Sequence, residues 1–130
     1  LGKLDLFIER RRELAHQYDD LFKSFKNVTP SQGYGRENSA HHLYVININF
    51  KEAKTTRFEL MSRLRSKGVG TQVHYIPVPM HPFYENLGFN LTEYPVCRDY
   101  YETCLSIPMY YTLTNEEQNH TVSLIKQFVE

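Results

Sequence analysis

The clearest pattern of secondary structure lies in residues 42–76, which read HLYVININFKEAKTTRFELMSRLRSKGVGTQVHYI. Its first part, residues 42–50, places apolar side chains at every second position, among them Tyr44, Ile46 and Ile48. Side chains two positions apart point to the same face of a β-strand. The alternation therefore predicts a strand with one buried face.

A helix and a second strand are predicted directly after this strand. Thr56 and Glu59 have the spacing of a capping box, which marks the first turn of a helix. Gly68 follows the last apolar position, where a left-handed residue readily ends a helix. Residues 69–76 then predict a second strand. The apolar stripe expected along the helix consists of Phe58, Leu60, Met61 and Leu64.

Elements on either side complete the predicted fold. Apolar side chains at three- and four-residue steps predict a helix near residues 4–25, with Arg10, Arg11 and Arg12 on its solvated face. Residues 27–39 predict a loop. The elements expected downstream are a helical turn at residues 83–87, a helix that begins at Pro95, a strand at residues 105–107 and a final helix capped by Thr114 and Glu117. About four helices on a sheet of two to four strands make an α+β fold, or a small α/β layer.

The composition fits one globular domain and argues against two classes of partner. Fifteen Lys and Arg balance fifteen Asp and Glu, so there is no basic excess of the kind that nucleic-acid binders show. No apolar run approaches the roughly 18 residues that a membrane span needs. A hydrophobic fraction of 41% is too high for a disordered chain. We therefore expect one neutral domain with no nucleic-acid or membrane partner.

The start of the chain and its cysteines predict a cytoplasmic location. No secretory segment stands at Leu1, and the chain opens inside an amphipathic pattern, so we expect a piece of a longer protein. Cys97 and Cys104 lie too far apart on a predicted helix to form a disulfide. We expect both to be reduced and buried thiols, as is usual in the cytoplasm.

Candidate functional groups are densest in residues 68–79. In a strand, Gln72 and His74 share one face, while Val73 and Tyr75 share the other. An amide and an imidazole so placed offer paired hydrogen bonds to a polar ligand such as a sugar or a phosphate. The strand leads into a proline-rich loop, and binding residues are common at such exits. The alternative is that His74 is an ordinary half-buried strand residue.

Other residues add little chemistry. His81 lies in the proline-rich loop and could line the same cleft as His74. His41 and His42 are adjacent, so in a strand they face opposite ways and make a poor metal pair. The sequence holds no HExxH or GxSxG motif and no glycine-rich phosphate loop. The residues alone therefore predict a polar binding patch without a catalytic or metal-ligating set.

Several segments resemble one enzyme family, and they follow one another in the family's order. Residues 68–78, GVGTQVHYIPV, resemble the GIGTQVHYIPV strand of the pyridoxal-phosphate-dependent sugar aminotransferases of the DegT/DnrJ/StrS type. LSIPM at 105–109, LTNEEQ at 113–118 and PFY at 82–84 match three further motifs of that family. Residues 4–12 resemble the helix that follows its Asn-Tyr-Arg motif. The resemblance covers essentially the whole chain.

The resemblance implies a domain of a larger enzyme. Residues 1–130 would be its C-terminal small domain, a mostly antiparallel sheet covered by about four helices, as in fold-type I enzymes related to aspartate aminotransferase. Residues 1–26 would form a helix that continues from a missing large domain. That domain would bind pyridoxal 5'-phosphate (PLP) and carry the catalytic lysine, so the chain alone is expected to be inactive. The full-length enzyme is expected to be a homodimer.

The resemblance also implies a substrate. The unbroken TQVHYIP of residues 71–77 is most similar to the transaminases of pseudaminic acid biosynthesis. The expected reaction moves an amino group from glutamate to a nucleotide-linked keto-sugar such as UDP-4-keto-6-deoxy-N-acetylhexosamine, for surface polysaccharide or glycan biosynthesis. In the family this strand closes over the substrate. Substrate-binding roles are therefore implied for Gly70, Thr71, Gln72, His74 and Tyr75, with no catalytic or cofactor-binding residue in the chain. His81 is a further substrate-binding candidate because of its place in the proline-rich loop.

One loop departs from the family, and two other functions stay open. Pro79 and His81 stand where the family commonly has His and Gln. This change indicates either altered sugar specificity or a position without a role. The chain could instead be a stand-alone α+β domain that binds a ligand or regulates another protein, without catalytic activity. The apolar stripe of the first helix is also compatible with a dimer-forming module.

Overall fold

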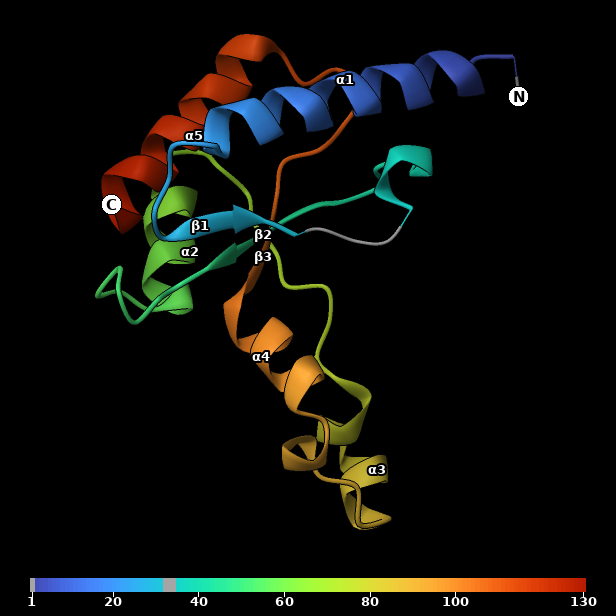
Figure 1. Cartoon of the computed structure of the whole chain (residues 1–130), viewed down its shortest axis with the longest axis vertical. Helices are drawn as coiled ribbons and strands as arrows, with labels where there is room; N and C mark the ends of the chain where they lie inside the picture. Colours follow the sequence, from blue (N-terminus) through green and yellow to red (C-terminus); the bar gives the residue numbers. More distant parts are fainter. Residues whose placement is uncertain (1, 32–34) are drawn as a thin grey trace.

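A three-stranded antiparallel sheet lies at the centre of the chain (Figure 1). The computed structural model describes residues 2–31 and 35–130. The strands follow the order β1-β2-β3 across the sheet, so β2 is central and the other two are edges. Their bounds are Val28–Pro30 for β1, Tyr44–Ile48 for β2 and Cys104–Ile107 for β3.

The central strand confirms the alternation seen in the sequence. Tyr44, Ile46 and Ile48 are buried, and Val45 and Asn47 between them are half-buried. Because β2 pairs with a neighbour on each side, its backbone groups are satisfied within the sheet. Its buried face can therefore form the floor of the hydrophobic core.

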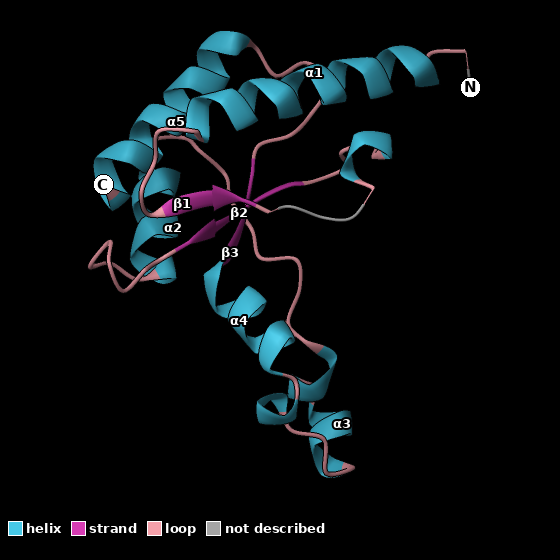
Figure 2. Cartoon of the chain, viewed as in Figure 1, coloured by secondary structure: helices cyan, strands magenta, loops and turns pink. Residues whose placement is uncertain are grey.

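Three long helices enclose this core: α1 (Leu4–Phe22), α2 (Arg57–Ser66) and α5 (Asn115–Val129). α1 and α5 pack against each other along one side of the sheet, and α2 packs against α5 (Figure 2). Their buried side chains, among them Tyr18, Leu60 and Ile125, join those of the sheet in one cluster. Each such side chain contributes about 1.5–3 kcal/mol by its burial. Within the described ranges, no helix is both long and apolar enough to cross a membrane.

Two capping boxes set the starts of α2 and α5, as the sequence predicts. The Glu59 amide donates to the Thr56 hydroxyl at 3.2 Å, and the Thr56 amide donates to the Glu59 carboxylate at 2.8 Å. Thr114 and Glu117 repeat this arrangement at 3.2 and 2.9 Å. Gly68 follows α2 with a φ of 81°, a conformation that a side chain would strain. The predicted start and end of α2 are both confirmed.

An arm, residues 78–103, extends from the sheet on the side away from α1 and α5 (Figure 1). Pro82 and Pro95 begin its two α-helices, at the position where a backbone amide hydrogen is not needed. None of its four elements contains a buried residue, so the arm has helices but no core of its own. The four elements are η2 (Val78–Met80), α3 (Pro82–Asn86), η3 (Leu91–Glu93) and α4 (Pro95–Thr103).

The structure corrects two predictions about strands. Residues 69–76 pair with the sheet only at Gln72, which forms an isolated bridge with Ser106. β3 offers a short edge, and Pro77 has no amide hydrogen with which to extend a ladder. β1 lies inside the predicted loop 27–39, because pairing with β2 decides its conformation and local sequence does not.

The predicted solvated face of arginines on the first helix is wrong. One guanidinium nitrogen of Arg11 lies 3.0–3.1 Å from the carbonyl oxygens of His41, His42 and Met109. Arg10 and Arg12 also donate to backbone carbonyls of distant segments. A guanidinium group has five N–H donors on a long stem, so it can satisfy several carbonyls at once. The arginines therefore tie α1 to the segments before β2 and after β3.

Two side chains predicted to be buried are exposed. Phe58 is 80% exposed on α2, because it stands two positions from the buried Leu60 and so points to the opposite side of the helix. Cys97 is exposed on α4, whereas Cys104 is buried in β3. Both thiols are free, and burial raises the pKa of the Cys104 thiol above its usual value.

Candidate functional site

A cleft of about 310 Å³, here called the His74 cleft, opens beside the edge strand β3. It brings together four of the predicted site residues from the segment that follows α2: Gly70, Thr71, Gln72 and His74. The remaining lining comes from the segment before β2 and from β3 and its exit: His42, Leu43, Ser106, Ile107, Pro108 and Met109. Three stretches that are distant in sequence thus meet in one hollow.

Two backbone hydrogen bonds hold the 70–74 segment against the edge of β3. The Gln72 amide donates to the Ser106 carbonyl at 3.1 Å, and the Ser106 amide donates to the Gln72 carbonyl at 2.8 Å. An uncovered edge strand would leave these groups unpaired. The bridge therefore stabilises β3 and holds Gln72 and His74 beside the cleft. The sequence predicts that these two side chains share one face.

His74 is held in place by a side-chain contact from β3. Its Nδ1 lies 2.8 Å from Oγ of Ser106, and Ser106 is only 5% exposed. The Tyr75 ring meets the imidazole edge to face, with 4.8 Å between ring centroids. His74 itself is half-buried. Its ring is therefore fixed on one side and accessible from the cleft on the other.

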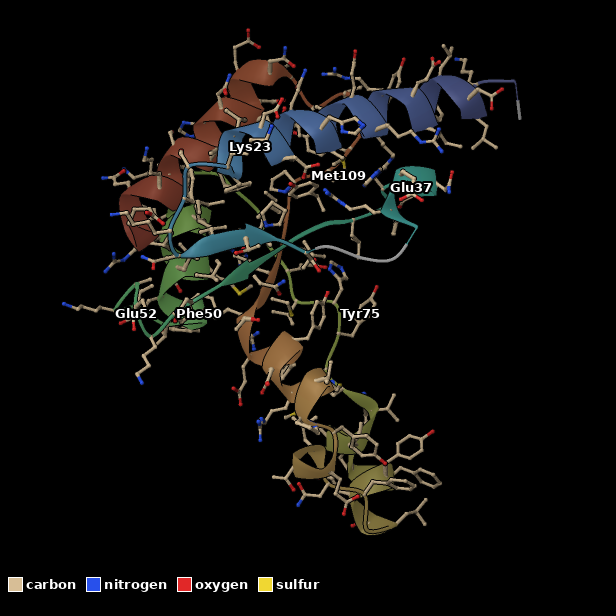
Figure 3. All side chains as sticks on the ribbon, in the orientation of Figure 1. Lys23, Glu37, Phe50, Glu52, Tyr75 and Met109 are labelled. Carbon is tan, nitrogen blue, oxygen red and sulfur yellow. The ribbon has the colours of Figure 1, made fainter. Side chains whose placement is uncertain are left out.

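Tyr75 and His81 do not line the cleft, although the sequence predicts binding roles for both. Tyr75 is 74% exposed on the stretch between the sheet and the arm, where Figure 3 labels it. His81 is exposed in the arm, and its carbonyl oxygen accepts hydrogen bonds from the first turn of α3. The structure therefore brings together only part of the predicted set, and the roles of these two residues stay predictions.

The wall of the cleft that β3 provides was not predicted from the sequence. Ser106 is buried and contacts His74, and Met109 follows it at the exit of the strand. The one available signal was the LSIPM motif at 105–109, which marks a strand but gives no role to its serine. Antiparallel pairing places Ser106 opposite Val45 of β2, and this long-range register is not visible in the local sequence.

The lining of the His74 cleft contains none of the lysines of the chain. Every lysine of the chain is exposed. The cleft contains no arginine either, so it offers no permanent cation to a phosphate group. Across residues 2–31 and 35–130, no three His, Cys, Asp or Glu side chains gather closely enough to hold a metal ion. The groups that the cleft offers to a ligand are therefore hydrogen-bonding ones, from Thr71, Gln72 and His74.

A polar cluster next to β2 borders a second cavity, of about 420 Å³. Arg36 lies 2.6 Å from the Asp19 carboxylate, and the Tyr44 hydroxyl donates to the same carboxylate at 2.6 Å. Burial, followed by the hydrogen bond to Asp19, raises the pKa of Tyr44 well above its usual value. Because the three groups satisfy one another, the cluster is a structural link between α1, β2 and the turn η1 (Arg36–Asn38).

A larger hollow, of about 710 Å³, lies between α1 and the start of α5. Glu9, Glu13 and Glu116 are among its lining residues, and Arg10 pairs with Glu13 at 2.6 Å. It contains none of the predicted binding residues. Size alone therefore does not identify the functional site.

Comparisons with known sequences support a single family. The sequence pattern of the DegT/DnrJ/EryC1/StrS aminotransferase family matches residues 1–126. The chain is 30% identical over 132 residues to the spore coat polysaccharide biosynthesis protein SpsC of Bacillus subtilis. It is 31% identical over 129 residues to the UDP-4-amino-4,6-dideoxy-N-acetyl-beta-L-altrosamine transaminase of Helicobacter pylori. These alignments cover 100% and 98% of the chain but 34% of each relative, so the chain spans about a third of their length.

Solved structures have the same fold. The chain superposes with a TM-score of 0.87, at 26% identity, on a Streptococcus pneumoniae protein assigned as a sugar aminotransferase, covering 99% of this chain and 32% of the other. That protein is also known in PLP and PMP forms. A Helicobacter pylori aminotransferase involved in the biosynthesis of pseudoaminic acid superposes with a TM-score of 0.77 at 28% identity, over 93% of this chain and 32% of the other. The motifs, the α+β fold and these matches agree, and the chain belongs to the DegT/DnrJ/EryC1/StrS aminotransferase family.

Proposed function

We propose that residues 1–130 are the C-terminal small domain of a PLP-dependent sugar aminotransferase, and that the His74 cleft closes over its nucleotide-sugar substrate. The share of each relative that the chain matches, about a third, supports a domain of a larger enzyme. The observation that carries the proposal is the cleft itself. It gathers Gly70, Thr71, Gln72 and His74 from the family's substrate-side segment at one opening.

The cleft offers hydrogen bonds that suit a sugar. Thr71 supplies a hydroxyl group, Gln72 an amide and His74 an imidazole, so donors and acceptors are both present. A Cβ atom placed on Gly70 would meet no other atom within 4 Å, so the backbone there is open to close approach. Sugar hydroxyl groups donate and accept hydrogen bonds, and this mixed set of groups can satisfy them.

The finer assignment follows the relatives. The Helicobacter pylori transaminase is named for an amino-dideoxy-N-acetyl sugar carried on UDP. We therefore propose a substrate of the UDP-4-keto-6-deoxy-N-acetylhexosamine class, with glutamate as amino donor, for surface polysaccharide or glycan biosynthesis. The enzyme that contains this domain would act in the cytoplasm as a homodimer.

The cofactor and its lysine are assigned to the rest of the enzyme. PLP, when bound, supplies the electron sink for amino-group transfer. The exposed positions of all the lysines in this chain support this division. The chain would bind and orient the nucleotide-sugar and exclude water, and it would be inactive on its own.

The arm supports the same proposal. It exposes large apolar side chains, with Phe83 67%, Leu87 61% and Val96 83% exposed. A large apolar surface of this kind marks an interface. We assign the rest of the enzyme as the part that covers the arm.

Reductive labelling tests the proposal. The 130-residue chain and the intact enzyme are each incubated with stoichiometric PLP, reduced with borohydride and digested. The intact enzyme is expected to retain a pyridoxyl group on a lysine outside residues 1–130, and the chain alone to retain none at a defined site. Specific labelling of one lysine of the chain, such as Lys51 or Lys67, would show that the domain assignment is wrong.

Ligand binding separates this proposal from the stand-alone alternative. If the cleft is one wall of a larger site, the isolated chain binds the nucleotide-sugar much more weakly than the intact enzyme does. Calorimetric titration of both proteins measures the difference. Equal affinities would favour a stand-alone α+β domain that binds a ligand or regulates.

A further inference from the structure

We infer that Ser106 is a positioning residue: its buried hydroxyl group donates to Nδ1 of His74, so that Nε2–H becomes the donor that the cleft offers to the substrate. Only the donation from Nε2–H to a substrate rests on the proposed function. The direction of the hydrogen bond is a property of the chain itself and can be tested without one.

The contact between the two side chains is short and sheltered. Oγ of Ser106 and Nδ1 of His74 lie 2.8 Å apart, within the usual range for a hydrogen bond. All four residues of β3 are buried, and Ser106 is 5% exposed. The paired backbone hydrogen bonds between Ser106 and Gln72 hold the two segments in register at this point. Ser106 is therefore held against His74 at the wall of the cleft.

The direction of the hydrogen bond follows from what each arrangement leaves unsatisfied. Among the described residues, Nδ1 of His74 is the only partner of the Ser106 hydroxyl group. If Nδ1–H donated, the hydroxyl proton would lack an acceptor among the described residues, and a buried donor without a partner costs about 1–3 kcal/mol. If the hydroxyl group donates, only oxygen lone pairs lack a partner, and buried acceptors tolerate this better than donors do. The hydroxyl group therefore donates, and neutral His74 carries its proton on Nε2.

This tautomer selects the chemistry of the ligand. Nε2–H can donate but cannot accept, so the ligand atom that meets it must be an acceptor. The acceptors of a nucleotide-sugar are oxygen atoms of its sugar and of its diphosphate. The edge-to-face contact with Tyr75 restricts rotation of the imidazole and keeps the donor in one direction. His74 is therefore a fixed donor to an oxygen of the substrate.

Imidazole 15N spectra of the intact, histidine-labelled enzyme test the direction. The two nitrogens of a neutral ring resonate far apart according to which one is protonated, and spectra recorded at several pH values identify the neutral form. The His74 signals are identified by their loss in His74→Gln. We expect a protonated Nε2 in the wild type and a changed Nδ1 signal in Ser106→Ala. A protonated Nδ1 in the wild type would overturn the inference.

A matched control shows whether the spectral change is specific. Ser123 lies on α5, where its hydroxyl group donates to the His120 carbonyl at 2.8 Å and has no contact with His74. Ser123→Ala is expected to leave the His74 signals unchanged. The same change in Ser123→Ala and Ser106→Ala would mean that Ser106 acts only through general stability, and the positioning role would be lost.

Kinetics of two isosteric variants test the donor role. Gln places an amide donor near the position of Nε2, whereas Glu places only acceptors there. The KM for the nucleotide-sugar is expected to stay within about threefold in His74→Gln and to rise at least about tenfold in His74→Glu, with smaller changes in kcat. Equal increases would overturn the donor assignment. If Nε2 is protonated as expected but neither variant changes the KM, the proposed function is contradicted. The inferred direction of the hydrogen bond would still stand.

Inhibition by UDP then identifies which oxygen of the substrate accepts the hydrogen bond from Nε2–H. If His74→Glu weakens UDP inhibition as much as it weakens use of the nucleotide-sugar, the acceptor is a phosphate oxygen. If UDP inhibition is unchanged, the acceptor is an oxygen of the sugar. Both results support a donor at Nε2.

The same assay tests the role of Ser106. Ser106→Ala is expected to raise the KM for the nucleotide-sugar, and Ser106→Thr, which keeps the hydroxyl group, is expected to restore it in part. An unaltered KM in Ser106→Ala would contradict the positioning role.

Discussion

Arg11 links three segments of the chain through one guanidinium group. It reaches carbonyl oxygens in the segment before β2 and at the exit of β3, next to the His74 cleft. Hydrogen bonds from a charged donor contribute more than neutral ones, especially where water is partly excluded. Helical periodicity identifies the face on which Arg11 lies but not the loops that cover this face, which is why the sequence predicts a solvated residue.

Removal of this link is expected to destabilise the domain. Arg11→Ala should lower the free energy of unfolding by about 2 kcal/mol, because partly buried carbonyls lose a charged partner. Urea denaturation followed by circular dichroism measures the change. Arg65→Ala, at an exposed position on α2, is the control and should change stability by less than about 0.5 kcal/mol. A loss in Arg11→Ala no larger than in the control would contradict this role.

The sequence identifies only some of the residues that form the His74 cleft. Gln72 and His74 were identified because they lie two positions apart in one segment, and the structure places both at the cleft. Ser106 could not be identified in this way, because its contact with His74 depends on how β3 meets a segment 32 positions away. Tyr75 was assigned a binding role by the family resemblance and His81 by its place in the next loop, but neither residue lines the cleft.

Helix ends are the elements that local sequence predicts best. The capping boxes that begin with Thr56 and Thr114 each depend on two residues that are three positions apart in the sequence. Both capping boxes are present in the structure. Strands depend on partners instead. β1 has three residues and includes Pro30, so it forms only because β2 lies beside it. Residues 69–76 have a strand-like pattern, but the available edge of β3 accommodates only one bridging pair.

A change at the α2 cap tests the contribution of these local signals. Thr56→Ala removes the acceptor for the Glu59 amide and should lower the free energy of unfolding by about 1 kcal/mol. Thr56→Ser keeps a capping hydroxyl group and should cost only a few tenths of that amount. Thermal or urea unfolding of both variants provides the comparison. If the two variants were equally destabilised, the capping interaction would not be the cause.

At the scale of the whole molecule, the core and the arm differ in how they are stabilised. The core is a single cluster between the sheet, α1, α2 and α5. The arm has no buried residue in any of its helices, so little apolar burial holds it in the isolated chain. The proposed function explains this difference, because a larger enzyme would cover the arm.

Hydrogen exchange can show whether the arm depends on such a cover. Amides of α4 are expected to exchange rapidly in the 130-residue chain and slowly in the intact enzyme. Amides of α5, which lies in the core, should be protected in both and serve as the internal control. Mass spectrometry of peptic fragments resolves the two regions. Equal protection of α4 in both proteins would contradict an arm that needs the rest of the enzyme.

Steady-state kinetics of His74→Ala in the intact enzyme measure whether the His74 cleft binds the nucleotide-sugar. The imidazole is expected to bind ground state and transition state alike, so its loss should raise the KM for the nucleotide-sugar about tenfold and change kcat much less. His120→Ala, at an exposed position on α5, is the control and should match the wild type. A collapse of kcat at unchanged KM, or no effect on either constant, would contradict the account.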